Sequence, residues 1–518
     1  MNNKGKACAA FLSLLILLPS QAFAIYKADD SDTGTGALEF LENRRRIERE
    51  NMLTEEQQRL KEDMKQMSEN LRHPVDPAKA APMAFEGDDL TYNEETGEFV
   101  AKGKVHAIQM DGHQFDSPEG PVQGNLKTSD IEIPGKSHML QLTPGQSRVI
   151  LDGLNTVYNY RTKLGTMEAA SGKVDHYYVT GKRFEFYPDK IVVYDGTATK
   201  CGAKKPDYHE SARKMTIYPE DKIVMEHAGI WLKDVCIYTK KSYVVDLQKE
   251  QQNLELPRVG YSRNDGAWIS QDFSFPIAPN VSAGAHLYAN SKKGLRSNGQ
   301  IGWYNRFSRY ELRYGDYEDG NDKWIKKQPS FVYKYARPLG KTHLHYSLDL
   351  EFGRWYNKTN DVSSNHSYYG LTLSRDPIFL GGGWYICPSA TYSITKESYD
   401  SSRVSGFSWR LSTVKEFDSR WAMYATYSYD KNNTKNNLFS YNLENFARKF
   451  MTGFSYRASD KDRFVVGVAY DLDEGGFNFN KMNYFWFHNL HCSQLIVHYK
   501  HYKNEKDSIK FQWQFTPW

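Results

Sequence analysis

The segment HLHYSLDLEF, residues 343–352, alternates strictly between two kinds of side chain. Its even positions, from Leu344 to Phe352, are apolar or aromatic, and its odd positions, from His343 to Glu351, are polar or charged. Successive side chains of a strand point to opposite faces, so this pattern predicts a strand with one apolar and one polar face. Residues 421–430 (WAMYATYSYD) and 509–515 (IKFQWQF) alternate similarly. Segments of this kind, about ten residues long, are typical of a transmembrane β-barrel.

Alternating segments continue through residues 251–518, separated by turn-like stretches such as EDGND at 318–322 and NNTK at 432–435. Their count predicts an antiparallel barrel of about 14 strands, an even number as in bacterial barrels. The final residues FTPW, 515–518, end an alternating strand on an aromatic residue, as expected where a last strand closes a barrel against the first. A soluble β-sandwich or propeller is the alternative, and the aromatic outer faces argue against it.

The composition agrees with a barrel and excludes other classes. Aromatic residues make up 14% of the 518 residues, although the mean hydropathy is −0.69. A lipid-facing belt would hold the aromatic residues, and a lumen would hold the polar ones. No apolar run of about 18 residues exists, which excludes a helical membrane protein. A net charge of +4 gives no reason to expect a nucleic-acid partner.

The first 24 residues have the pattern of a secretory signal peptide. Lys4 and Lys6 precede an apolar run from Ala9 to Leu18, and Ala22-Phe23-Ala24 is a small-x-small cleavage site. The alternative, an uncleaved anchor, is disfavoured by the short apolar run. We therefore expect an exported protein, located in the outer membrane with its N-terminal domain in the periplasm.

Residues 25–82 differ from the rest of the chain. From Ala37 to Leu71 the sequence is rich in charged residues and Gln and contains neither Gly nor Pro, and Pro74, Pro77 and Pro82 follow. This predicts a short N-terminal helix and a linker. The apolar stripe of the helix is thin, which favours a solvated spacer over a docking helix.

Residues 83–250 contain repeated β-segments. LTYN at 90–93, followed by AKGKV at 101–105, recurs as TVYN at 156–159 followed by ASGKV at 170–174. YPDKIV at 187–192 recurs as YPEDKIV at 218–224. Such strand-turn-strand units bury their apolar faces only by stacking, so they predict an elongated, jellyroll-like β-domain with a shared interior.

Four cysteines remain after the signal peptide: Cys201, Cys236, Cys387 and Cys492. An even number in an oxidising compartment favours disulfides, for which three connectivities exist. Cys201 and Cys236 each close a comparable repeat, which favours that pair. None has a metal-binding spacing, so we expect no metal and no cofactor.

Three stretches of the sequence resemble the lipopolysaccharide-assembly outer-membrane protein family, LptD or OstA. They are the two Tyr-Asn repeats (92–105 and 158–174), the junction at 212–238, and LPRVGYS at 256–262 with Gly266-Ala267. The resemblance in sequence covers most of residues 85–290. The rest of the chain resembles the family in its architecture only. It implies a translocon that receives lipopolysaccharide from a periplasmic β-bridge and inserts it into the outer leaflet through a lateral barrel opening. It implies no covalent chemistry.

The resemblance also implies partners. These are lipopolysaccharide, an LptA-like periplasmic bridge protein, outer-membrane lipids and the barrel-assembly machinery. An LptE-like plug lipoprotein is a further candidate partner in this family. The barrel portion here, about 260 residues, is roughly half of what the family's barrel of about 26 strands requires.

Site residues follow from the same resemblance. Apolar side chains of the repeats are candidates for a lipid trough, with an ordinary jellyroll core as the alternative: Phe99, Val105, Phe115, Val174, Phe184, Ile191, Val193, Ile223 and Ile230. Pro cannot donate a hydrogen bond to a strand ladder, so Pro276 and Pro517 are candidates for a lateral gate where the first and last strands meet. Simple strand termination is the alternative for each.

An enzyme is not expected. His343 and His345 are two residues apart, on the face of Asp349 and Glu351, which would permit a metal or acid-base role in a lumen. No nucleophile motif accompanies them, and lumen-facing histidines explain the pattern. A porin-like channel with an appended periplasmic β-domain is the alternative function.

Overall fold

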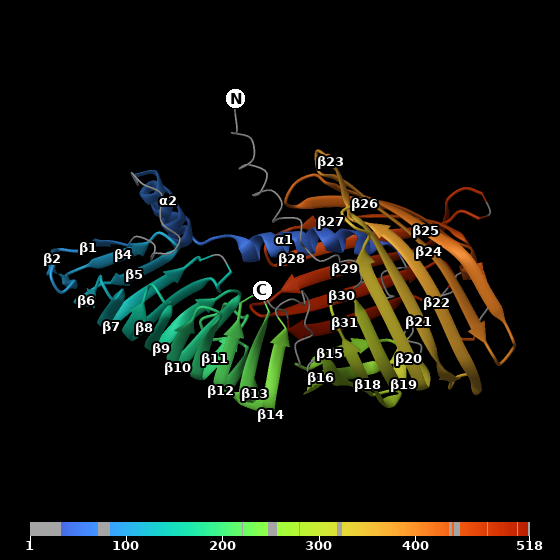
Figure 1. Ribbon diagram of the computed structural model, residues 1–518. Coiled ribbons are helices and arrows are strands. Elements are labelled where there is room, and N and C mark those ends of the chain that lie inside the picture. Colours follow the sequence, from blue (N-terminus) through green and yellow to red (C-terminus); the bar gives the residue numbers. More distant parts are fainter. Residues whose placement is uncertain are drawn as a thin grey trace. The chain divides into compact units, whose positions relative to one another are not determined.

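The computed structural model (Figure 1) describes residues 33–70, 83–143, 145–219, 221–246, 256–278, 280–318, 324–434, 438–439, 446–473, 475–504 and 506–515. The predicted signal peptide, residues 1–24, lies outside these ranges, as does Pro517. The chain divides into two compact units. One contains residues from Asn253 to Phe515 together with the N-terminal residues up to Arg45, and the other runs from Arg46 to Gln252.

The N-terminal charged region forms two α-helices instead of one. A 3-10 turn, η3 (Thr35–Leu38), leads into α1 (Glu39–Asn51), and α2 (Glu55–Asn70) follows. The break has a local cause, because Thr54 and Gln57 form a capping box at the start of α2. The Gln57 amide donates to Thr54 Oγ1 at 3.2 Å, and the Thr54 amide donates to Gln57 Oε1 at 3.1 Å. Neither helix has the length and apolarity to cross a bilayer.

The unit from Arg46 to Gln252 is built on one 14-stranded antiparallel sheet (Figure 1). From β7 to β14 each strand pairs with the next in the sequence, and β1 to β6 form the less regular end. The repeated Tyr-Pro segments lie at the turns that join β10 to β11 and β12 to β13. The strands are β1 (Met83–Glu86), β2 (Asp89–Tyr92), β3 (Glu98–Lys102), β4 (Val105–Gln109), β5 (His113–Ser117), β6 (Val122–Asn125), β7 (Asp130–Gln141), β8 (Val149–Asn159), β9 (Leu164–Val174), β10 (Tyr177–Tyr187), β11 (Lys190–Thr199), β12 (Tyr208–Tyr218), β13 (Lys222–Leu232) and β14 (Val235–Asp246).

Helix α2 packs on the outer face of this sheet. Leu60 is fully buried against Ile108 of β4 and Leu140 of β7, with Met64 and Met67 of α2 beside it. Ile108 and Leu140 lie on the face opposite the sheet interior, since they alternate with interior residues along their strands. The thin apolar stripe of the helix is therefore sufficient to dock it, and α2 is not a solvated spacer.

The second unit is a closed antiparallel barrel of 16 strands with one additional short strand, β23, among the described residues. The all-β prediction is confirmed, with a barrel two strands larger than the count from sequence. The strands are β15 (Arg258–Ser262), β16 (Gly266–Ala278), β17 (Val281–Asn290), β18 (Gly294–Tyr304), β19 (Ser308–Glu318), β20 (Trp324–Pro338), β21 (Leu344–Asn357), β22 (Val362–Arg375), β23 (Ile378–Gly381), β24 (Trp384–Glu397), β25 (Arg403–Glu416), β26 (Trp421–Asp430), β27 (Arg448–Arg457), β28 (Asp462–Asp471), β29 (Asn478–Asn489), β30 (Ser493–Tyr502) and β31 (Ser508–Phe515). A further 3-10 turn, η4 (Lys431–Thr434), follows β26.

The barrel strands carry their large apolar side chains on the outer face. In β26, Trp421 and Met423 are exposed, whereas the alternate residues Ala422 and Tyr424 are buried. In β22, exposed Leu371 lies directly opposite Leu348 of β21. Directly opposed residues of an antiparallel pair share a face, so the even positions of residues 343–352 point outward as predicted.

Candidate functional site

The interior of the 14-stranded sheet holds all nine predicted trough residues. Phe99, Val105, Phe115, Val174, Phe184, Ile191, Val193, Ile223 and Ile230 are each at most 3% exposed. They come from strands β3 to β13, so the apolar interior extends along almost the whole sheet. Tyr158 adds aromatic contacts to Phe115 and Phe186, with ring centroids 5.0 and 6.3 Å apart. These contacts are those of a packed interior, and burial alone does not assign lipid passage to any of them.

A polar cluster interrupts this apolar interior. Fully buried His113 places Nε2 2.9 Å from Tyr158 Oη and Nδ1 3.0 Å from Asp111 Oδ1. Lys163 Nζ donates to Gln109 Oε1 at 2.8 Å and forms an ion pair with Asp111. Burial lowers the pKa of His113 although Asp111 opposes the change, so the ring is neutral at neutral pH.

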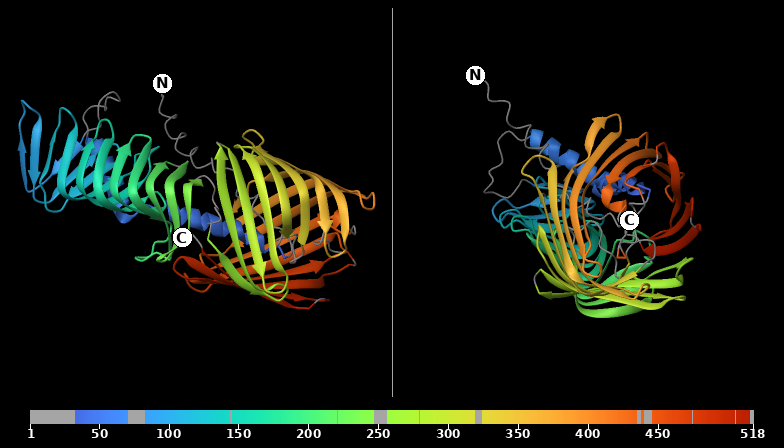
Figure 2. Two further views of the ribbon diagram at one scale, coloured as in Figure 1. Left: turned by 90° about the horizontal axis from the view of Figure 1, so that it is seen from below. Right: turned by 90° about the vertical axis from the view of Figure 1, so that its right-hand side faces the viewer.

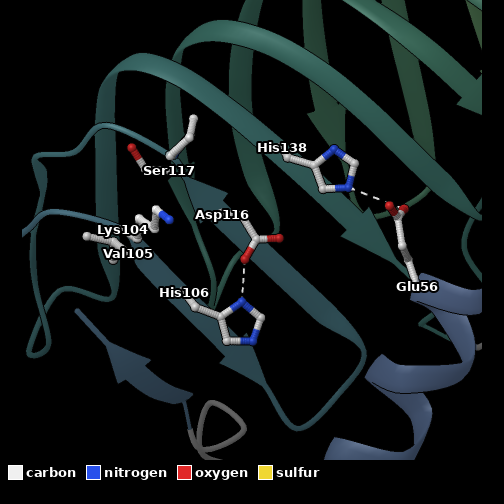
Figure 3. A pocket seen from close by; sticks show the side chains of 8 residues that line it. Glu56, Lys104, Val105, His106, Asp116, Ser117 and His138 are labelled. Atoms are coloured by element: carbon white, nitrogen blue, oxygen red, sulfur yellow. Dashed lines mark hydrogen bonds and ion pairs between the residues drawn. The ribbon is translucent and has the colours of Figure 1, made fainter. Parts of the chain in front are cut away.

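A shallow hollow of about 340 Å³ lies on the outer face of the sheet beside α2 (Figure 3). His106 forms a hydrogen bond with Asp116 there, and His138 Nε2 lies 3.6 Å from Glu56 Oε2 of α2. The bond to Asp116 raises the pKa of His106. In each pair the histidine and the carboxylate are partners of each other, and both pairs lie on an open surface. We therefore assign no ligand to them.

The barrel lumen contains the N-terminal residues of the same compact unit, residues 33–45, which we call the lumen segment. The right-hand view of Figure 2 looks into the ring of strands and shows the first turns of α1 within it. Tyr424 Oη donates to the Thr33 carbonyl oxygen at 2.6 Å, and Asn483 Nδ2 donates to Thr33 Oγ1 at 2.8 Å. Tyr424 is buried and follows exposed Met423 on β26, which places its ring on the lumen side.

Apolar contacts hold the lumen segment to neighbouring strands of the barrel wall, among them β24 to β28. Leu38 and Leu41 are each 1% exposed. Phe40 packs edge-on against Tyr385 of β24, with ring centroids 5.2 Å apart. The barrel residues that bury Leu38 and Leu41 are Val414, Ala422, Tyr424, Met451, Val465 and Ala469.

The barrel closes through a short ladder between its first and last strands. Within the described residues, the ladder of β15 and β31 spans four residues of each strand, from Val259 opposite Trp513 to Ser262 opposite Lys510. By comparison, the ladder of β21 and β22 spans fourteen residues of each strand. The β15–β31 ladder is therefore far shorter than a full-length ladder of the same barrel.

Pro276 lies on the second strand, β16, opposite Ser282 of β17 and beside a register shift. It is therefore one strand away from the β15–β31 ladder. Within the described residues, β15 pairs with residues 266–270 of β16, and the stretch of β16 that contains Pro276 pairs with β17. The other gate candidate, Pro517, is outside the described residues.

The predicted Cys201–Cys236 pair is wrong. Cys201 is disulfide-bonded, whereas Cys236 is a free thiol, as is Cys387. Cys201 follows β11 and Cys236 lies in β14, with β12 and β13 between them in the sheet. At about 4.8 Å per strand spacing, that separation is roughly 14 Å, about twice the limit for a disulfide.

His345 of β21 and His343, just before this strand, pair with a carboxylate rather than forming a metal site. His345 Nε2 lies 2.8 Å from Asp376 Oδ1, and His343 Nδ1 lies 3.4 Å from Asp376 Oδ2. No group of three or more metal-ligating side chains is found in the described part of the chain. Sequence reasoning placed Asp349 and Glu351 beside them, but Glu351 pairs with Lys327 and Ser330 instead.

A closed antiparallel barrel with an apolar outer face defines an outer-membrane β-barrel protein. No family model matches the sequence. The LPS-assembly protein LptD of Bordetella avium is 27% identical over 59% of this chain and 32% of its own length. That of Mannheimia succiniciproducens is 23% identical over 62% of this chain and 41% of its own length.

Together with the LptD proteins of Ralstonia nicotianae and Cupriavidus metallidurans, both 22% identical, these relatives support the LptD family for this chain. The chain spans only about a third of the length of these relatives. Among solved structures, porin mutants of Rhodopseudomonas blastica match half of this chain at 9–10% identity and a TM-score of 0.31, and we draw nothing from that likeness. The barrel and the LptD relatives point to the outer membrane.

Sequence reasoning missed the lumen segment. Its signal is the short apolar run ALEFL at residues 37–41, which precedes a long charged stretch. When the apolar residues are considered over the whole charged region, this run contributes only to a thin apolar stripe. Only the ring of strands around it makes Leu38 and Leu41 core residues.

Proposed function

We propose that the chain is an outer-membrane translocon for lipopolysaccharide. In this proposal it receives the lipid from an LptA-like periplasmic β-bridge and inserts it into the outer leaflet through a lateral opening in the barrel. The LptD relatives and the closed barrel support an LPS-assembly outer-membrane protein. Outer-membrane lipids and the barrel-assembly machinery are the other partners that the proposal requires.

The 14-stranded sheet would carry the acyl chains. Its interior presents apolar side chains over nearly its whole length, from Phe99 on β3 to Ile230 on β13. Burial of an acyl chain in such an interior is favourable by about 0.8 kcal/mol per methylene. Passage would require these side chains to separate, since they pack against one another when no lipid is present.

The observation that carries the lateral opening is the length of the β15–β31 ladder. Opening four residues of ladder breaks about four hydrogen bonds, against about fourteen for β21 and β22. Each unpaired backbone group costs several kcal/mol in lipid, so the ring opens most readily where the ladder is shortest.

A disulfide across this ladder tests the proposal. Tyr261 and Phe511 lie directly opposite each other and both are exposed on the outer face, so Tyr261→Cys with Phe511→Cys can close the ladder. Leu348→Cys with Leu371→Cys is the matched control on β21 and β22. The first pair, once oxidised, is expected to stop lipopolysaccharide from reaching the cell surface, and a reductant is expected to restore it. Export that continues with the ladder fully cross-linked would refute a lateral opening there.

A porin-like channel with a periplasmic β-domain of another role is the second candidate, because 16 strands is a typical porin size. Depletion of the protein distinguishes the two functions. A translocon predicts loss of lipopolysaccharide from the surface. A channel predicts reduced solute uptake with surface lipopolysaccharide unchanged, and that outcome would replace the proposal.

A further inference from the structure

The lumen segment and the barrel wall have complementary shapes. A Cβ atom on Gly467 of β28 would lie 2.6 Å from Thr35 Cγ2 and 2.6 Å from Tyr424 Oη. A Cβ atom on Gly34 would lie 3.2 Å from Met451 Cβ, and Gly34 has the left-handed φ of 73°. Glycine at these two positions lets the backbone of the segment lie against the wall.

Charges on the segment are also matched by charges on the wall. Glu416 of β25 accepts hydrogen bonds from Arg44 Nη2 and Arg45 Nη2, both at 2.7 Å. Glu42 forms an ion pair with Arg457 of β27 and lies 4.0 Å from Arg463 of β28. The paired Arg45, Glu416, Arg457 and Glu42 side chains are only 15–21% exposed.

The environment keeps Glu42 ionised. Burial would raise its pKa, but the guanidinium groups of Arg463, Arg457 and Arg45 outweigh burial and hold the pKa below its ordinary value. The segment therefore combines a fitted apolar surface with two oppositely charged anchors, Glu42 and the Arg44–Arg45 pair. Such matching on both surfaces is expected of a built interface rather than of a chain end that happens to lie in a channel.

We propose that residues 33–45 form a plug, supplied by the chain itself, that closes the barrel lumen to small solutes. A barrel of about 16 strands is wide enough to leave an aqueous channel, and a helix with its side chains is about 10–12 Å in diameter. The segment thus occupies lumen space that a separate plug protein would otherwise fill. This inference depends on the barrel alone and not on lipopolysaccharide transport.

Conductance of the full chain in planar bilayers tests the plug. Glu42→Gln with Glu416→Gln keeps the side-chain shapes but leaves four arginines without their carboxylates. The control is Glu62→Gln with Glu55→Gln, at exposed positions of α2. We expect the lumen variant to raise the open fraction of the channel about tenfold, a moderate effect for ion pairs that remain partly exposed, and the control to leave it unchanged. A wild-type chain that already conducts as an open pore, with no change in the variant, would overturn the proposal.

A covalent lock separates loss of the plug from general damage to the barrel. Gly34→Cys with Met451→Cys places two Cβ positions 3.2 Å apart, close enough to cross-link after a small shift. Added to the Glu42→Gln, Glu416→Gln variant, the oxidised lock is expected to return conductance to the wild-type level. Heat-dependent gel mobility reports whether each barrel is folded. A leak that persists in a folded, fully locked variant would show that the segment does not seal the lumen.

Discussion

Adding a single methyl group to the barrel wall should displace the lumen segment. In Gly467→Ala, the new Cβ lies 2.6 Å from Thr35 Cγ2 and from Tyr424 Oη, and 3.1 Å from Thr33 Oγ1. Contacts under 3.0 Å do not persist, so either the segment or the Tyr424 ring must shift. Overpacking of this kind costs about 1–3 kcal/mol, which corresponds to an approximately 5- to 150-fold increase in the displaced population.

Planar-bilayer conductance measures the displaced population. Two further variants test whether the clash with Thr35 causes the displacement. Gly299→Ala is the control, because a Cβ there would meet only the Gly284 carbonyl oxygen at 3.6 Å, an ordinary contact. Thr35→Ser removes the methyl group that clashes. The double variant with Gly467→Ala should therefore conduct less than Gly467→Ala alone, and closer to the low wild-type level. Equal conductance of Gly467→Ala and Gly299→Ala would refute the reasoning, as would a rise that Thr35→Ser leaves untouched.

Three further outcomes are expected. Because the pKa of Glu42 in the docked segment is below its ordinary value of 4.5, its contribution to docking is complete above about pH 4.5 and is lost as the pH falls through the lower value. Conductance should therefore rise on acidification below pH 4.5, and Glu42→Gln should remove that dependence. Leu60→Ala, at a fully buried position, should weaken docking of α2 by about 2–5 kcal/mol and speed its proteolysis, whereas Lys61→Ala, at an exposed position, should not. Thiol titration of the denatured, unreduced mature chain should find two free thiols, falling to one in Cys236→Ser and rising to three in Cys201→Ser.

The strand pattern was predictable because it is local. Trp421 and Met423 were assigned to the outer face from alternation, and both are exposed. The pleat alone fixes which side chains share a face, so no knowledge of neighbouring strands is needed. The capping box at Thr54 and Gln57 is equally local, and it divides a helix that composition suggested was continuous.

The disulfide and the closing ladder were not predictable in this way. Cys236 follows Cys201 closely in the repeat pattern, yet two strands lie between their positions in the sheet. Similarly, Pro276 lies on β16 where this strand pairs with β17, but the strand that pairs with β31 is β15. Sequence position orders the strands, whereas the length of each ladder depends on how the ring closes.

By itself, the sequence determined an all-β chain with a repeat domain, an antiparallel barrel and the outward face of the barrel strands. Periodicity and repetition are properties of the sequence, and they do not depend on how the strands are arranged in space. Tertiary structure alone decided that Leu38, Leu41 and Glu42 belong to the barrel lumen. Their partners are about 370 to 430 residues away in sequence, and only closure of the ring brings that wall around them.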